Sequence, residues 1–378
     1  MRDTVEIGQG KTARRGYDLD EIAIVPTRRT RGSQDVSIGW QIDAFPFSLP
    51  LVAHPSDATM SPRTVAEVGR LGGLGVLNGE GLWARHEDPT SMLRSVWPKD
   101  GEAMDARAVT RRLQASYVDP IRPDLLADRV EELRRSGSTT AVRLSPQHTM
   151  ELAPVLLDGG IDMLVIQGTI VSAEHVSEHT APLNLKEFIA DLDVPVIVGG
   201  CATYQTALHL MRTGAAGVIV GMGADGFATS DDVLGIRVPM ASAIADAAAA
   251  RRDYLDETGG RYVHVIADGG IECSGAIAKA IACGADAVML GSPLAAAEEA
   301  PAAGAWWHTA AAHPKLPRGL VAPPREPVGP LQTLLNGPSD DPTGEANLFG
   351  GLRRSMAKTG FSDLKEFQRV ELTLGTPA

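Results

Sequence analysis

Eight short apolar runs recur along the chain and predict buried strands. They cover residues 51–54, 73–78, 139–144, 163–167, 195–200, 215–221, 262–268 and 286–292. Several, such as VIVGG and GVIVG, are apolar without interruption instead of alternating with polar residues. Uninterrupted apolar strands are typical of a parallel sheet that is covered on both faces.

Helical patterns separate these strands, at 61–70, 124–135, 150–157, 185–192, 203–212, 241–256 and 274–283. Ser61 followed by Pro62 is a typical helix start, and many of the helices end at a glycine. Eight strands that alternate with helices predict an α/β fold, a closed (β/α)8 TIM barrel, rather than an open doubly wound sheet. The first strand ends AHPSD, without the GxGxxG of a dinucleotide-binding sheet.

We expect one barrel domain over residues 1–378, with two stretches outside the strand–helix rhythm. Residues 80–123 are polar and irregular and form a long connection, too short for an inserted domain of ordinary size. Residues 293–331 are rich in Ala and Pro and predict a lid-like loop before the C-terminal element.

Composition excludes several classes of protein and partner. The chain is 44% hydrophobic, which is typical of a globular protein, and its 35 Lys and Arg against 47 Asp and Glu give a net charge of −12. An acidic chain without a basic block is unsuited to nucleic acid or an anionic membrane. The chain has three cysteines and no CxxC pair, it starts with polar residues, and no apolar run approaches 18 residues. These features favour a cytoplasmic protein.

The ends of the seventh and eighth strands are the first candidate site. In a barrel the reactive groups lie at the carboxyl ends of the strands, and the last two strands commonly bind phosphate. Here these ends carry Asp268, Gly269 and Gly270, and then Gly291 and Ser292. Glycines let backbone N–H groups approach a phosphate, and Asp268 can accept hydrogen bonds from a ribose diol. Alternatively, the glycines only permit tight turns and Asp268 caps a helix.

The loop after the sixth strand, residues 221–235, is rich in glycine and acidic, with Asp225, Asp231 and Asp232. Three carboxylates repel a phosphate unless a cation or the backbone offsets them. Cys201 follows two glycines at the end of the fifth strand, where a reactive thiol could lie, although buried structural cysteines are commoner.

The histidines predict no metal site. His175 and His179 are four residues apart but follow a loop signal, so a zinc-binding helix face is not expected. His54 ends the first strand and could face the site. For His308 and His313, in the lid-like segment, we expect exposure to solvent.

Several motifs resemble those of the IMP dehydrogenase and GMP reductase family. RGYDLDEIAIVPTRRT is similar to the family's TFDDVLLVP opening, LPLVAHPSDATMS to IPLVSSPMDTVTE, and RLGGLGVLN to RLGGIGVIH. The most specific match is VIADGGIECSGAIAKAIACGADAVMLGS, and FGGLRRSMAKTGFSDLKEF resembles the family's C-terminal LRSSMGY-G element. The resemblance spans nearly the whole chain and implies the short branch of the family, without the inserted regulatory domains.

The resemblance implies an NAD(P)-dependent oxidoreductase of purine nucleotides. IMP dehydrogenase converts IMP, NAD⁺ and water to XMP and NADH, and GMP reductase converts GMP to IMP. In both enzymes a cysteine attacks C2 of the purine. The implied ligands are IMP or GMP, NAD beside Gln167, Gly168 and Thr169, and a potassium ion on backbone carbonyls of the 221–235 loop. A homotetramer is also implied.

The catalytic loop departs from the family pattern G-x-G-P-G-S-x-C-T-T-R. The cysteine position is Ala228 and the arginine position is Asp231, while the family's Arg-Tyr flap is replaced by WWHTAAAHPKLPRG. Thr229, Ser230 and Cys201 are the candidate replacements for the nucleophile, and Gly226 of this loop joins the expected substrate contacts.

Three hypotheses follow from the resemblance and from this departure. The first is the family reaction on IMP, which an alanine methyl group cannot start. The second is a catalytically silent barrel that binds a purine nucleotide as a sensor or regulator. The third is a GMP reductase-like or altered reaction on another purine nucleotide.

Overall fold

The eight predicted strands form one parallel sheet in the computed structural model, which describes residues 4–97, 105–178, 182–222 and 226–375. They are β6 (Leu51–Ala53), β7 (Val76–Asn78), β8 (Ala141–Leu144), β9 (Met163–Gln167), β10 (Val196–Cys201), β11 (Gly217–Val220), β12 (His264–Asp268) and β13 (Ala287–Leu290). The sheet closes where Leu74 pairs with β6, donating to the Leu51 carbonyl at 2.8 Å. The predicted (β/α)8 barrel is confirmed.

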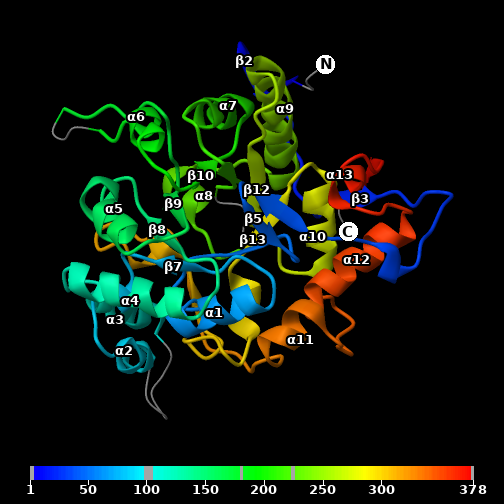
Figure 1. Cartoon of the computed structure of the whole chain (residues 1–378). Coiled ribbons are helices and arrows are strands. Elements are labelled where there is room, and N and C mark those ends of the chain that lie inside the picture. The colour runs from blue at the N-terminus through cyan, green and yellow to red at the C-terminus, as the bar shows by residue number, and fades with distance from the viewer. Residues whose placement is uncertain (1–3, 98–104, 179–181, 223–225, 376–378) are drawn as a thin grey trace.

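The seven predicted helices are also present and lie around the strands (Figure 1). They are α1 (Pro62–Arg70), α4 (Pro123–Arg135), α5 (Thr149–Asp158), α6 (Leu185–Ala190), α7 (Tyr204–Arg212), α9 (Met240–Thr258) and α10 (Ser274–Ala282). The Ser61 hydroxyl accepts a hydrogen bond from the Thr64 amide at 3.1 Å, so Ser61 and Pro62 start α1 as predicted. No helix in the described part of the chain is long and apolar enough to cross a membrane.

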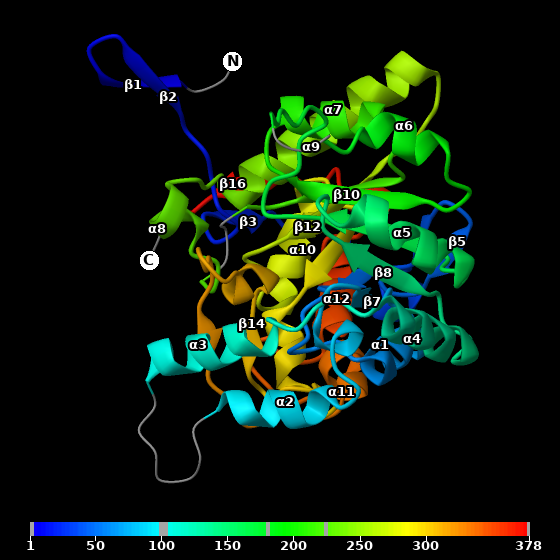
Figure 2. The same cartoon turned by 90° about the vertical axis from the view of Figure 1, so that its left-hand side faces the viewer.

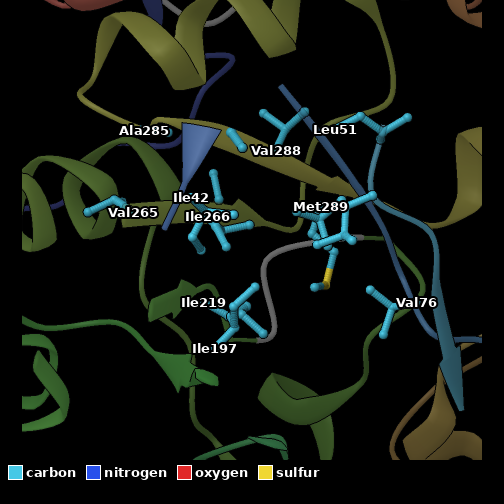
Figure 3. Packing of buried hydrophobic residues seen from close by; sticks show 14 of the residues in the cluster. Ile42, Leu51, Val76, Ile197, Ile219, Val265, Ile266, Ala285, Val288 and Met289 are labelled. Atoms are coloured by element: carbon cyan, nitrogen blue, oxygen red, sulfur yellow. The ribbon is translucent and has the colours of Figure 1, made fainter. Parts of the chain in front are cut away.

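The barrel interior is filled with aliphatic side chains (Figure 3). At its amino-terminal end it is plugged by the hairpin of β4 (Trp40–Ile42) and β5 (Phe45–Phe47). Ile42 is fully buried and lies beside Ile266, and a Cβ on Gly217 would lie 3.3 Å from the Ile42 side chain. Because this end is closed, the opposite end, where the strands terminate, is left for the site.

Two strands from the early and late parts of the described chain pair outside the barrel. β3 (Ile22–Ile24) pairs antiparallel with β16 (Leu372–Leu374), and α11 (Leu331–Asn336), α12 (Leu348–Lys358) and α13 (Leu364–Phe367) follow one another along this side. The hairpin of β1 (Thr4–Gly8) and β2 (Lys11–Arg14) projects from the body of the molecule (Figure 2).

The connection over 80–123 is more ordered than its sequence predicts. It contains the short helix η2 (Leu82–Ala84) and two α-helices, α2 (Pro89–Val96) and α3 (Ala106–Ser116). The Asp88 and Asp105 side chains cap the two α-helices. Their apolar residues form a second core with tryptophans from the lid-like segment, so the expected irregular connection is wrong.

The lid-like segment, residues 293–331, is packed rather than loose. It contains η3 (Ser292–Ala296), the antiparallel pair β14 (Trp306–Trp307) and β15 (Val321–Ala322), and η4 (Thr309–Ala312). Trp307 is fully buried, and the Ser56 hydroxyl donates to its carbonyl at 2.7 Å. Since the tryptophans are buried against α2 and α3, this segment forms a fixed cover.

Candidate functional site

A cavity of about 930 Å³ opens at the carboxyl ends of the strands. Its walls come from the ends of β7, β8, β9 and β12, from the loop after β11 and from the lid-like segment. His54, which we expected to face the site, lines it, and so does His308, which is half-buried rather than exposed as expected. A cavity of this size, with polar and apolar side chains in its wall, is the expected place for a small-molecule site at this end of a barrel.

The three candidate cofactor residues and two of the candidate substrate residues, Asp268 and Gly269, line this cavity together. The Gln167 amide at the end of β9 donates to the Asp268 carboxylate at 3.1 Å, over a sequence separation of 101 residues. Gly168, Thr169 and Gly269 line the cavity beside them. Gly269 has a φ of 119°, which only glycine adopts readily, so the turn after Asp268 depends on it.

The other predicted phosphate-platform residues lie outside the described cavity lining. Ser292 is 7% exposed, and its hydroxyl donates to the Glu272 carboxylate at 2.6 Å. Gly291 lies under the ring of Trp306, where a Cβ would come within 2.2 Å of the indole. Gly270 is likewise absent from the lining. Gly291 therefore accommodates an indole ring.

The loop after β11 is joined to the lid-like segment. Ala228 lines the cavity and forms an antiparallel bridge with Gly319, and the Leu320 amide donates to the Phe227 carbonyl at 2.7 Å. Thr229 is the residue before the short helix α8 (Ser230–Leu234) and makes no side-chain capping hydrogen bond, and the first helix residue, Ser230, lines the cavity. Gly226 and Thr229 are outside the lining, and residues 223–225, including Asp225, lie outside the described part of the chain.

A charged cluster that the sequence did not reveal stands at the ends of β7 and β8. Glu80 lies 2.9 Å from Nδ1 of His148 and 3.8 Å from a guanidinium nitrogen of Arg143. Arg143 also donates to the Gln167 carbonyl at 2.5 Å. Burial by itself raises the pKa of Glu80, but His148 and Arg143 outweigh it and hold that pKa at about 2. Fixed charges therefore line this wall at neutral pH.

A second missed group is buried at the cavity wall, where Tyr117 lines the cavity. The Tyr117 hydroxyl donates to Asp57 at 2.6 Å and accepts a hydrogen bond from the Trp307 indole at 3.3 Å. Asp57 is 1% exposed, and burial raises its pKa to about 6 in spite of this hydrogen bond. The three residues connect the first strand's loop, α3 and the lid-like segment.

A protein-family model for the IMP dehydrogenase / GMP reductase domain matches residues 16–321. The chain belongs to this family. A protein of Mycobacterium tuberculosis named an uncharacterized oxidoreductase is 60% identical over 375 residues, covering 98% of this chain and all of that protein. Inosine-5'-monophosphate dehydrogenase of Methanocaldococcus jannaschii is 33% identical over 257 residues, 61% of this chain and 50% of that enzyme.

A solved structure has the same fold along nearly its whole length. The IMP dehydrogenase/GMP reductase-like protein of Corynebacterium glutamicum superposes with a TM-score of 0.93 at 55% identity, covering 99% of this chain and 98% of the other. The family resemblance seen in the sequence is thus confirmed along the whole barrel.

The family resemblance predicts a nucleophilic cysteine in the loop after the sixth strand, and the sequence pattern predicts Ala228 at that position. Cys201 does not replace it. Its side chain is 1% exposed and donates to the Ile219 carbonyl at 3.4 Å. Burial raises the pKa of the Cys201 thiol to about 12, so it stays protonated at neutral pH. The sequence-based candidate Cys201 is a core residue.

His179, one of the two histidines considered as zinc ligands, lies outside the described residues. Among the residues described, one acidic group has three possible metal ligands close together: Asp18, Asp20 and Glu21. Asp18 already accepts hydrogen bonds from Arg237 and from the Met240 amide, at 2.6 and 2.9 Å. Asp18 thereby stabilises the start of α9.

We predict that the free energy of unfolding depends on pH because the Asp57 carboxyl is buried. Its pKa is about 6 in the folded chain against an ordinary 3.8, so between pH 4 and 6 the unfolded chain loses a proton that the folded chain keeps. The free energy of unfolding therefore falls as pH rises through this range, by roughly 2–3 kcal/mol from this group. Asp57→Asn removes the contribution.

Urea unfolding of the wild type and of Asp57→Asn at pH 4 and pH 7 measures this contribution. The free energy of unfolding of the variant minus that of the wild type is expected to rise by roughly 2–3 kcal/mol from pH 4 to pH 7. Asp256→Asn, which changes an exposed carboxylate at the end of α9, serves as the control and should show a constant difference. A constant difference for Asp57→Asn as well would contradict the prediction.

Proposed function

We propose that this barrel binds a purine nucleoside or nucleotide in the cavity at its strand ends, and that it does not oxidise IMP through a covalent cysteine intermediate. The observation that carries the binding proposal is the Asp268 carboxylate, held at the cavity wall by the Gln167 amide at 3.1 Å. A carboxylate held in this way accepts hydrogen bonds from the two hydroxyls of a ribose. The family relationship supports the same class of ligand.

Ala228 supports the second half of the proposal. It lines the cavity at the family's cysteine position, and a methyl group has no lone pair with which to attack C2 of the purine. A purine-binding regulator is therefore favoured over the family reaction. A reaction on another purine nucleotide, of the GMP reductase type or altered from it, is the remaining alternative.

We propose that the same cavity also holds a nicotinamide dinucleotide. The cavity of about 930 Å³ is at the upper end of the usual range for ligand sites, and Gln167, Gly168 and Thr169 line one part of it. These residues would hold the nicotinamide end of NAD, which supplies a hydride acceptor when bound. A homotetramer in the cytoplasm, as the family resemblance implies, belongs to the same proposal, as does a potassium ion on the 221–235 loop.

Asp268→Ala is expected to weaken purine binding by roughly 1–3 kcal/mol, because the ribose hydroxyls lose their charged acceptor. Thermal shift and calorimetry with IMP, XMP, GMP, AMP, inosine and guanosine measure the effect. A ligand at 100 times its Kd should stabilise the wild type by about 2.7 kcal/mol.

Asp256→Asn is the control and should bind like the wild type, because its side chain is exposed on α9. If no purine compound binds the wild type at millimolar concentration, the proposed function is wrong.

A further inference from the structure

The strand-end platform that binds phosphate in many barrels is covered here by the protein itself. Ser292 would offer its hydroxyl to a phosphate, but that hydroxyl donates to the Glu272 carboxylate at 2.6 Å. The first amide of α10, at Ser274, donates to the Gly344 carbonyl at 2.8 Å. The space over Gly291 is filled by the indole of Trp306, which is 3% exposed.

Two of the usual phosphate donors therefore already have protein acceptors, and a ring blocks the approach to Gly291. One of the acceptors is itself an anion. Glu272 lies within the ADGGIECSG segment, directly after the turn that begins at Asp268. A phosphate placed at this platform would lose the Ser292 hydrogen bond and would lie against the Glu272 carboxylate. Like charges in close contact at a binding site weaken binding strongly.

We infer that the site selects an unphosphorylated purine nucleoside or base over the corresponding 5′-monophosphate, because the Glu272–Ser292 hydrogen bond occupies the phosphate platform. The inference rests on the proposed function, since it concerns the same cavity. It agrees with the lining of the cavity, which includes Asp268 and Gly269 but, in the described chain, neither Gly291 nor Ser292.

Arg325 is the cation that could act against this selection. Its guanidinium donates to the Ser292 carbonyl at 3.1 Å, so it is already bound at the platform. To accept a phosphate, Arg325 would have to exchange this carbonyl for the ligand while Glu272 moved away. A direct comparison of nucleoside and nucleotide affinities shows whether Arg325 stays on the Ser292 carbonyl or turns to a bound phosphate.

The experiment is calorimetry on the full chain with inosine, IMP, guanosine and GMP. We expect the wild type to bind each nucleoside at least about tenfold more tightly than its monophosphate. Glu272→Gln keeps an acceptor for Ser292 and removes the charge, so it is expected to gain about tenfold or more in affinity for IMP and GMP, with inosine and guanosine unchanged. Glu187→Gln, on the exposed face of α6, makes the same change in net charge and should bind like the wild type.

The outcomes separate the two proposals. If wild-type protein binds IMP or GMP as tightly as the nucleosides, the inference is overturned and the proposed function stands. If Glu272→Gln shifts nucleoside and nucleotide affinities equally, the inference is also overturned. If none of the four compounds binds the wild type, the proposed function is wrong and the inference falls with it. The wild-type comparison holds even if a variant does not fold.

Discussion

The purified protein is expected to form no measurable NADH from IMP and NAD⁺. In the family reaction, attack at C2 creates the tetrahedral centre from which hydride leaves, and Ala228 cannot begin that attack. Cys201 cannot replace it, because its thiol is buried and its pKa is raised to about 12 by that burial. Ser230 lines the cavity, but in the described chain its hydroxyl has no hydrogen bond to a histidine that could act as its base.

Ala228→Cys by itself is not expected to restore the reaction. Asp231 brings a negative charge where the family has an arginine, which disfavours a thiolate. The backbone of residue 228 also pairs with Gly319 of the lid-like segment, which holds the loop against its cover. The family's Arg-Tyr pair for activating water is missing from that segment's sequence as well.

The measurement is absorbance at 340 nm with saturating IMP, NAD⁺ and potassium, for the wild type and for Ala228→Cys. An authentic IMP dehydrogenase in the same assay is the positive control. Wild-type turnover on the order of 1 per second, at the low end for ordinary enzymes, would show that another residue starts the reaction. Comparable turnover in Ala228→Cys but not in the wild type would show that the residues around the loop still support the family reaction.

Asp286→Asn is expected to lower the free energy of unfolding by about 3–5 kcal/mol. Asp286 is 3% exposed and accepts hydrogen bonds from Arg251 at 2.6 Å, Tyr262 at 2.7 Å and the Val265 amide at 2.9 Å. The Lys365 ammonium, from α13, lies 2.6 Å from the same carboxylate. Arg251 is 6% exposed, so loss of the carboxylate charge leaves a buried guanidinium without its counter-ion.

Equilibrium unfolding in urea, followed by far-UV circular dichroism, measures the change. Asp256→Asn alters an exposed carboxylate near the end of α9 and should change stability by no more than about 0.5 kcal/mol. A loss below about 1 kcal/mol for Asp286→Asn would mean that Arg251 finds another partner or is hydrated. Because Lys365 belongs to α13, the same variant should also loosen the C-terminal helices, which hydrogen exchange can detect.

Local sequence patterns were sufficient for the barrel. The strands are recognisable because both of their faces are buried, so each is apolar without interruption, as in β9 and β11. Helix α1 is recognisable because two neighbouring residues start it: the Ser61 hydroxyl accepts a hydrogen bond from a free amide of the first turn, and Pro62 has the backbone angle of a first helical residue. The family resemblance also rests on contiguous motifs, and these motifs predict Ala228 at the position of the family's cysteine without any structure.

The site depended on contacts that no local pattern encodes. Asp57 and Tyr117 are 60 residues apart, and the two helices over 80–123 bury their apolar faces against Trp306 and Trp307, about 200 positions further on. The sequence alone predicts that Gly291 and Ser292 form part of an open phosphate-binding platform. Only closure of the barrel and packing of the segment after β13 brought Trp306 onto Gly291, and the same closure set Glu272 against Ser292. The sequence by itself determined which elements form, because propensity and burial act over neighbouring residues, whereas tertiary packing decided which side chains share the cavity.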